Sequence, residues 1–322
     1  MLLRAALAFN IVCGCEVLLA LLFNITLIVL AMYKSSGSIN ILRYFFIFFA
    51  ANNVAYAVAH GLPCIYISAP NGYLMCFSST AICPHVVSVV LSMWYVAEFV
   101  SSTMLSAVLF TYRYAILHTQ RLRFLFETTR GVVLVGSFYV LYVILVAFQI
   151  VYSFNATPED RATAREAFAD DFDYLNFDSV FLIAFNMQSA PSWKLASFLL
   201  MLILLTMPIA FIIFTGIRIQ SAINNKLIST RRKDEMRILR MMIVQVVNPV
   251  VTLYIPFLVD VVSALFVIDM GVSYDFFSYL LCFFPMLSPL IIVYYTPDYR
   301  RGFFKISGLA YAPAVGHIRT SS

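Results

Sequence analysis

The segment SWKLASFLLMLILLTMPIAFIIFTGI, residues 192–217, contains one charged side chain, Lys194, and is otherwise almost entirely apolar. A helix crosses the hydrocarbon core of a bilayer with roughly 20 residues. The residues that follow, RIQSAINNKLISTRRKDEMRILR at 218–240, carry seven Lys and Arg side chains. An apolar stretch of this length with basic residues after it predicts a transmembrane helix whose carboxyl end lies on the cytoplasmic side.

The same pattern extends over the whole chain of 322 residues. The chain is 62% hydrophobic and only 11% charged, whereas soluble domains carry about 25% charged residues. We therefore predict an all-α membrane protein, a seven-transmembrane helix bundle formed by one domain over residues 1–322. The predicted spans are residues 8–33, 41–66, 84–117, 131–153, 192–217, 236–267 and 274–295.

The basic residues predict the orientation of this bundle. Of the 21 Lys and Arg residues, 17 fall in alternate connections and in the tail at 296–322, and four fall on the opposite side. Because basic residues concentrate on the cytoplasmic side, the N-terminus is extracellular and the C-terminus cytoplasmic. We call these the outer and inner sides. The basic residues flank apolar spans, so their partner is the lipid bilayer and not nucleic acid.

The first span could also be a signal peptide. Its apolar run, however, continues from about residue 5 to residue 32 and contains Glu16, whereas the core of a signal peptide has about 7–15 residues. A retained first span is the preferred interpretation.

The longest connection, residues 154–191, lies on the outer side. Thr157 and Pro158, followed by two acidic residues, predict a short helix that ends near residue 168. Asn155 is a candidate glycosylation site. Three cysteines near the outer ends of spans two and three are disulfide candidates whose pairing stays open: Cys64, Cys76 and Cys83. The other three are expected to be packing residues: Cys13, Cys15 and Cys282.

No pattern in the chain supports an enzyme. The four His residues show no metal-ligand spacing, and the chain has neither a glycine-rich phosphate loop nor a nucleophile elbow. We expect no catalytic residue, no metal and no cofactor.

Polar residues at mid-membrane depth are unusual and have two interpretations. They form either a switch whose hydrogen bonds differ between two receptor states or a network that only stabilises helix packing. Glu98 lies near the middle of span three, and four other polar residues fall at comparable depth: Asn24, Asn52, Asn53 and Ser288.

A ligand site is expected in the outer half of the bundle. Glu16 and His60 lie at similar depths and could form a pair, and helical spacing places aromatic residues one turn outside Glu98. Ordinary helix packing explains the same residues equally well. The candidates for ligand contact are His60, Trp94, Tyr95, Glu98, Asp260, Tyr279 and Phe283.

The inner ends of spans three and six carry the candidates for coupling to a cytoplasmic partner: Tyr112, Arg113, Tyr114, Arg231, Arg232, Lys233 and Arg237. Snorkelling of Arg113 and lipid binding by the basic segment are the alternatives. Residues 298–305 predict a short interfacial helix after span seven. Five prolines are candidate kink sites: Pro208, Pro249, Pro256, Pro285 and Pro289.

Four short motifs occur in order along the chain. They are KSSG at 34–37, TYRY at 111–114, IVQVVNP at 243–249 with YIP at 254–256, and FPMLSPLII at 284–292 followed by Asp298-Tyr299-Arg300. With these motifs the chain resembles the nematode seven-transmembrane chemoreceptors of the Str type. Two positions differ from rhodopsin-like receptors or from the Str pattern. Tyr112 replaces the acid before Arg113, and Ser288 replaces the Asp that often precedes the proline of span seven in the Str type.

The resemblance implies a G-protein-coupled chemosensory (olfactory) receptor. Its partners would be a small-molecule odorant and a heterotrimeric G protein, and its location the plasma membrane of sensory cilia. The alternative from the residues themselves is a seven-span ligand-gated channel or transporter, which needs a continuous polar path through the bundle. A scaffold with a vestigial pocket is a third possibility.

Overall fold

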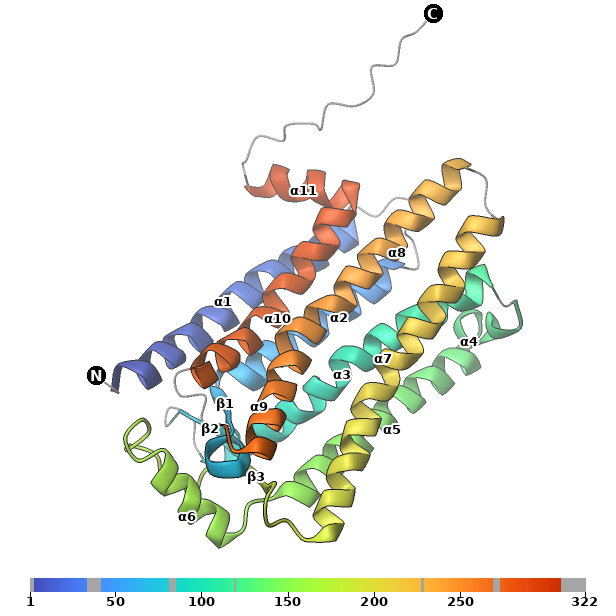
Figure 1. Ribbon diagram of the computed structural model, residues 1–322. Coiled ribbons are helices and arrows are strands. Elements are labelled where there is room, and N and C mark those ends of the chain that lie inside the picture. The colour runs from blue at the N-terminus through green and yellow to red at the C-terminus, as the bar shows by residue number, and fades with distance from the viewer. Residues whose placement is uncertain are drawn as a thin grey trace, which may run out of the picture.

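The fold is a bundle of long helices in a computed structural model that describes residues 3–33, 42–80, 85–118, 120–226, 229–268 and 273–307 (Figure 1). The KSSG motif at 34–37, Cys83 and the tail beyond residue 307 lie outside the described residues. Within these described residues, seven helical segments are long and apolar enough to cross a membrane, which confirms the predicted bundle. The helices that contain them are α1 (Leu3–Tyr33), α2 (Leu42–Gly61), α3 (His85–Leu117), α5 (Thr129–Phe154), α7 (Ser192–Lys226), α8 (Ser229–Pro249) continued by α9 (Ile255–Phe266), and α10 (Ser273–Tyr295).

Three spans differ from their predicted bounds by five residues or more. The fifth ends at Asn225 rather than at residue 217. The second helix ends at Gly61 rather than at residue 66, because residues 65–68 form a strand instead. The sixth spanning segment begins at Arg231 rather than at residue 236. Its basic first turns extend α8 beyond the apolar core on the inner side, where water solvates them.

A three-stranded antiparallel sheet covers the outer end of the bundle (Figure 1). Its strands are β1 (Ile65–Ser68), β2 (Tyr73–Ser78) and β3 (Leu182–Asn186). The described residues are otherwise mostly helical, as predicted, and the sheet is an addition that the sequence analysis did not predict. A tight turn at residues 70–72 joins β1 to β2, and Gly72 has φ +81, which favours glycine. Runs of β-branched and aromatic residues on both sides of such a turn are typical of a hairpin.

Both faces of this sheet are buried. Side chains alternate between the faces along a strand: Tyr66 and Phe77 pack outward against Phe168, Phe172 and Phe177 of the outer connection. The inward-facing set, which includes Ile67 and Phe185, joins the core between the helices. The sheet therefore forms the roof of the transmembrane core.

The outer connection contains the predicted short helix, α6 (Pro158–Ala167). The Thr157 hydroxyl accepts a hydrogen bond from the amide of Asp160 at 3.2 Å, and the Asp160 carboxylate accepts one from the Thr157 amide at 2.8 Å. This capping box fixes the start of the helix. Arg161 donates to the carbonyls of Phe177 and Val180, so α6 is held against the segment that leads into β3.

Three prolines inside helices leave carbonyls that neighbouring helices use. A proline at position i cannot donate to the carbonyl at i−4. Pro285 thus frees the Leu281 carbonyl, which accepts from the Tyr56 hydroxyl at 3.4 Å. Pro289 frees the Pro285 carbonyl, which accepts from Asn24 Nδ2 at 2.9 Å.

Helix α7 repeats the arrangement. Pro208 frees the carbonyl of Leu204, and the hydroxyl of Tyr142 on α5 donates to it. Because unsatisfied carbonyls are costly in the membrane interior, these side chains make the prolines tolerable. At three of the five predicted kink sites, the carbonyl that the proline frees accepts a hydrogen bond from a side chain of another helix.

Gly61 allows α1 and α2 to approach closely at the outer end. A methyl group on Gly61 would lie 2.4 Å from Val17 Cγ2 and 3.1 Å from the carbonyl oxygen of Cys13. We expect Gly61→Ala to lower the stability of the purified protein by about 1–3 kcal/mol through overpacking, measured as a lower melting temperature and less protein at the cell surface. Gly14→Ala is the control, since a methyl group there meets nothing within 4 Å. Equal losses in both variants would contradict the close approach.

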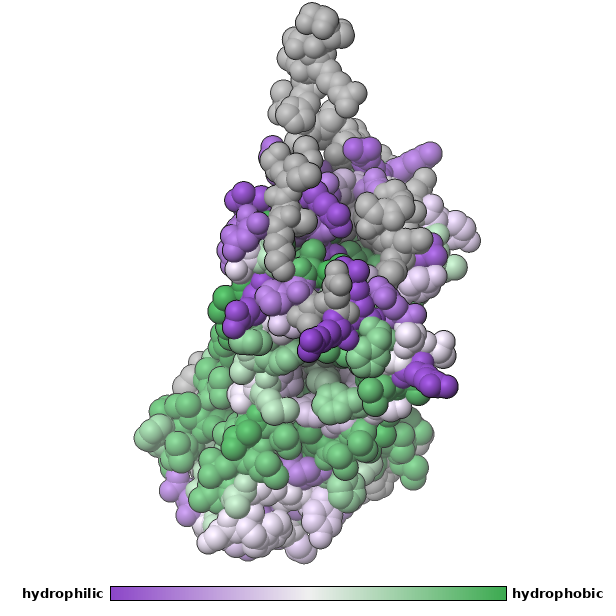
Figure 2. Space-filling model, turned by 90° about the vertical axis from the view of Figure 1, so that its right-hand side faces the viewer, coloured by the Kyte–Doolittle hydropathy of each residue, from purple (hydrophilic) through white to green (hydrophobic). Residues whose placement is uncertain are grey.

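The outside of the bundle is apolar between two more polar ends. Figure 2 shows an apolar band below the hydrophilic inner end. Exposed side chains such as Leu134, Phe138 and Leu141 on α5 contribute to such a surface, which suits lipid and not water. The predicted helix after span seven is present as α11 (Pro297–Ser307), on the inner side.

Candidate functional site

An apolar cavity lies directly beneath the sheet. It has a volume of about 80 Å³, and side chains from the sheet and from α3, α5, α7 and α9 surround it. Burial, with a smaller contribution from the negative charge of Asp260, raises the pKa of the Cys76 thiol to about 12, so this side chain stays neutral. No charged side chain lines the cavity among the described residues. The larger lining side chains are Tyr95, Phe99, Phe154, Phe185, Phe198 and Phe257.

Tyr95 connects this cavity to a buried hydrogen-bonded pair of side chains. Its ring lies 5.3 Å from the ring of His60 and 5.5 Å from that of Tyr56. His60 Nδ1 lies 2.7 Å from Glu16 Oε2, and both side chains are fully buried. The predicted pairing of Glu16 with His60 is confirmed.

Of the seven predicted ligand contacts, Tyr95 lines the cavity and Asp260 lies near it. Trp94 and Phe283 are 43% and 42% exposed on the outside of the bundle. The Trp94 indole donates to Glu98 Oε1 at 2.7 Å within α3, and Tyr279 packs against Phe9 at 5.6 Å. Consecutive helical residues point about 100° apart, so Trp94 and Tyr95 cannot share the cavity.

The predicted polar cluster at mid-membrane is divided into separate groups. Asn53 Nδ2 donates to Asn24 Oδ1 at 3.0 Å, and Asn24 reaches the backbone of α10. Ser288 of α10 accepts from Gln245 of α8. Asn52 instead faces α3 and α5, where it accepts from Ser101. Neither Asn52 nor Glu98 belongs to the group that contains Asn24.

An ion pair closes the inner end of the bundle. Arg113 at the end of α3 donates to the Glu235 carboxylate of α8, and the two side chains are only 8% and 14% exposed. Sequence reasoning missed Glu235, although it is one of only two acids in the basic segment 218–240. The neighbouring Tyr112 packs between Phe45 and Phe126.

A wide crevice opens on the inner side of the bundle. Its volume is about 750 Å³, and α7, α8 and Tyr295 of α10 line it. Among the predicted coupling residues, Arg232, Lys233 and Arg237 line the crevice, whereas Arg231 borders a smaller one of about 340 Å³. Tyr114 stacks on His118 at 5.0 Å instead.

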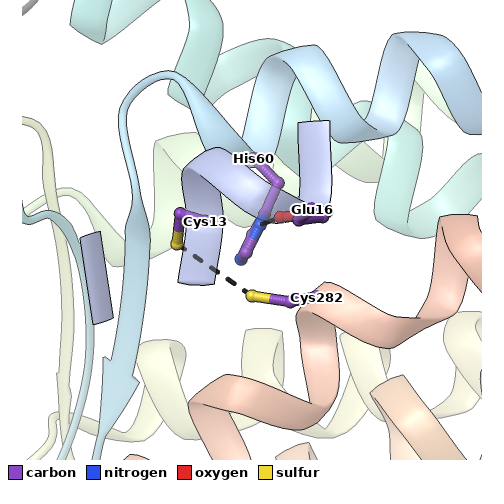
Figure 3. A group of neighbouring side chains, drawn as sticks. All are labelled: Cys13, Glu16, His60 and Cys282. Atoms are coloured by element: carbon purple, nitrogen blue, oxygen red, sulfur yellow. Dashed lines mark hydrogen bonds and ion pairs between the residues drawn. The ribbon is translucent and has the colours of Figure 1, made fainter. Parts of the chain in front are cut away.

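Two cysteines that were expected only to pack lie together with the Glu16–His60 pair (Figure 3). Cys13 Sγ and Cys282 Sγ are 4.0 Å apart. The four residues Cys13, Glu16, His60 and Cys282 offer ligand atoms that all lie within 4.8 Å of one another. They come from α1, α2 and α10, so no spacing along the sequence could have revealed them.

Of the three disulfide candidates, Cys83 lies outside the described residues. Cys64 and Cys76 are free thiols, and the Cys64 thiol donates to the Gly61 carbonyl at 3.2 Å. Asn155 is exposed at the end of α5, as glycosylation requires.

Comparison with known proteins agrees with this architecture. Residues 9–304 match the family model described as serpentine type 7TM GPCR chemoreceptor Str. The crystal structure of squid rhodopsin superposes with a TM-score of 0.64 at 15% sequence identity, over 97% of this chain and 89% of that one; this likeness concerns the fold. No curated protein matches the sequence. The family match covers nearly the whole chain, and the protein therefore belongs to the Str family of serpentine seven-transmembrane G-protein-coupled chemoreceptors, which are receptors and not enzymes.

Proposed function

We propose that this chemoreceptor detects a small apolar odorant in the cavity beneath the outer sheet and signals to a heterotrimeric G protein at the inner crevice. The observation that carries the proposal is the combination of an uncharged aromatic cavity on the outer side with an ion pair that closes the inner side. The receptor would act as a single seven-transmembrane domain in the plasma membrane of sensory cilia.

The size of the cavity limits the ligand. Sites for drug-sized molecules have volumes of about 300–1,000 Å³, and an apolar cavity of about 150 Å³ accommodates benzene. A cavity of about 80 Å³ suits a molecule with only a few non-hydrogen atoms, bound by dispersion and the hydrophobic effect. Larger odorants must displace aromatic side chains.

One aromatic path joins the cavity to the middle of the sixth span. Phe99 stacks on Tyr254 at 5.3 Å and contacts Phe257 at 6.0 Å. The Tyr254 hydroxyl lies 2.8 Å from Thr103 Oγ1. Tyr254 ends a π-helical turn, η4 (Val250–Tyr254), that separates α8 from α9. Such turns are frequent at functional sites, and a ligand between Phe99 and Phe257 would act on this turn directly.

The inner half of the bundle would respond to ligand binding by a change in how its helices pack. A ligand shifts the equilibrium only by its differential affinity for two packings. In the proposed mechanism the resting packing holds Arg113 against Glu235, and the active packing separates them and exposes Arg113 to the G protein. The hydrogen bonds of Asn53 with Asn24, of Asn24 with α10, and of Gln245 with Ser288 would change between the two packings.

The cavity can be tested by enlarging it. We expect Phe257→Ala to shift the preferred ligand towards larger apolar molecules and to raise the half-maximal concentration of the smallest agonist by about tenfold, since lost contacts of this kind are worth about 1–3 kcal/mol. The measurement is a calcium response in cells that express a promiscuous G protein, over a homologous series of volatile apolar compounds.

Phe266→Ala is the control, because Phe266 lies on the same helix and is 68% exposed. Both variants are compared at equal surface delivery. An unchanged size preference in Phe257→Ala would contradict the proposed cavity. A ligand-evoked current without a G protein would favour the channel alternative.

A further inference from the structure

The most unusual buried group outside the proposed ligand cavity is the cluster of Cys13, Glu16, His60 and Cys282. All four side chains are at most 1% exposed. The cluster joins α1, α2 and α10 near their outer ends, and Figure 3 shows the His60 ring extending toward the line between the two sulfurs.

The hydrogen bonds of the cluster are incomplete. The contact between His60 Nδ1 and Glu16 Oε2, 2.7 Å long, uses one nitrogen and one oxygen. His60 Nε2 and Glu16 Oε1 are buried and have no hydrogen-bond partner in the described part of the chain. A buried polar atom without a partner costs about 1–3 kcal/mol. A bound species that interacts with His60 Nε2 would therefore remove this cost.

We propose that the cluster binds a zinc ion through Cys13 Sγ, Cys282 Sγ and His60 Nε2. Two thiolates and an imidazole form a ligand set that zinc commonly takes, with a fourth position left for water or a nearby donor. In tetrahedral zinc sites thiolate sulfurs lie about 3.8 Å apart, and the two sulfurs here lie 4.0 Å apart. The helices already hold the ligands near the required separation.

Glu16 acts as a positioning residue in this site. A histidine that binds a metal commonly donates its other N–H to a carboxylate, which fixes the ring orientation and the tautomer. The contact of Glu16 Oε2 with Nδ1 has this form and leaves the lone pair of Nε2 for the metal. On binding, each thiol releases one proton to solvent, so the two thiolates balance the two positive charges of the ion.

The site would stabilise the outer end of the bundle. It ties three helices together next to Tyr56 and Tyr95, whose rings lie 5.7 Å and 5.3 Å from that of His60. The inference stands independently of the proposed odorant and G-protein sites, because it requires only the folded chain.

The first experiment measures zinc in the full-length receptor, purified in detergent, equilibrated with Zn²⁺ and separated by gel filtration. We expect about one zinc per chain for the wild type. Cys13→Ser, Cys282→Ser and His60→Gln should retain less than about a tenth of this, and Glu16→Gln should bind about 10–100-fold more weakly. The matched control is Cys15→Ser, because Cys15 is an exposed thiol on the same helix and its removal should leave the zinc content unchanged.

A second measurement on the wild type avoids variants that fold poorly. Zinc should slow the alkylation of Cys13 and Cys282 by a small membrane-permeant maleimide, and a chelator should restore it, as read by peptide mass spectrometry. Cys15 should react at the same rate in both conditions. A monodisperse wild type without zinc would overturn the proposal. So would a Cys13–Cys282 cross-link that a reductant opens and a chelator does not, because it would identify a disulfide.

Discussion

Glu235→Gln is expected to raise signalling in the absence of ligand. The substitution leaves Arg113 without its acid at a position where the arginine is only 8% exposed. The loss of this partner raises the free energy of the closed packing and not that of the active packing, in which the pair is already separated. Hydrogen bonds to charged groups are worth about 1.5–3 kcal/mol, so the ratio of active to closed receptor should rise on the order of 10- to 100-fold. The readout is basal second-messenger level per receptor at the cell surface.

Asp234→Asn is the matched control for this prediction. Asp234 precedes Glu235 but pairs with Arg237 at 3.2 Å, and its side chain is 69% exposed. Exposed pairs of this kind contribute about 0–1 kcal/mol, so basal signalling should stay unchanged. Arg113→Ala should silence the receptor even together with Glu235→Gln. A basal level in Glu235→Gln equal to that of Asp234→Asn would show that the ion pair does not hold the closed packing.

Asn24→Ala is expected to destabilise the bundle by about 2 kcal/mol, because it leaves buried groups on two other helices without partners. The Pro285 carbonyl loses a donor at 2.9 Å, and Asn53 Nδ2 loses an acceptor at 3.0 Å. Thermal inactivation of the purified receptor, followed as loss of the monodisperse peak, measures the effect.

Thr26→Ala provides the comparison on the same helix. The Thr26 hydroxyl donates only to the carbonyl of Leu22 within α1, at 2.7 Å, and its loss should change stability by less than about 0.5 kcal/mol. If both variants lose the same stability, the bonds between helices do not carry the stabilisation assigned to them.

The bundle was predictable because hydrophobicity and charge act over whole helices. Long apolar stretches and the bias of Lys and Arg, such as the seven basic residues at 218–240, place each span without knowledge of its neighbours. The capped start of α6 at Thr157 was predictable for a related reason, because a capping box is a local contact between residues three apart.

The sheet and the site needed contacts between distant segments. β3 lies more than 100 residues after β2 in the sequence. No local sequence pattern identifies the strand with which it pairs. Helix rotation was equally uncertain, so Trp94 and Tyr95 could not be told apart as ligand contacts. Glu235 was missed because the expected acid was sought next to Arg113, whereas the structure supplies it from α8. The proposed ligand, coupling and switch residues stay predictions until the variants are measured.

The carbonyls that prolines free in α7 and α10 set a condition on any motion of the bundle. Each is held by a side chain from another helix, Tyr142, Tyr56 or Asn24. In hydrocarbon no water replaces a lost donor. A helix can therefore settle only at positions where another donor reaches its carbonyl, and intermediate positions are disfavoured. Such a bundle moves in discrete steps, and a weak stimulus changes how often a step occurs and not how far the helix travels.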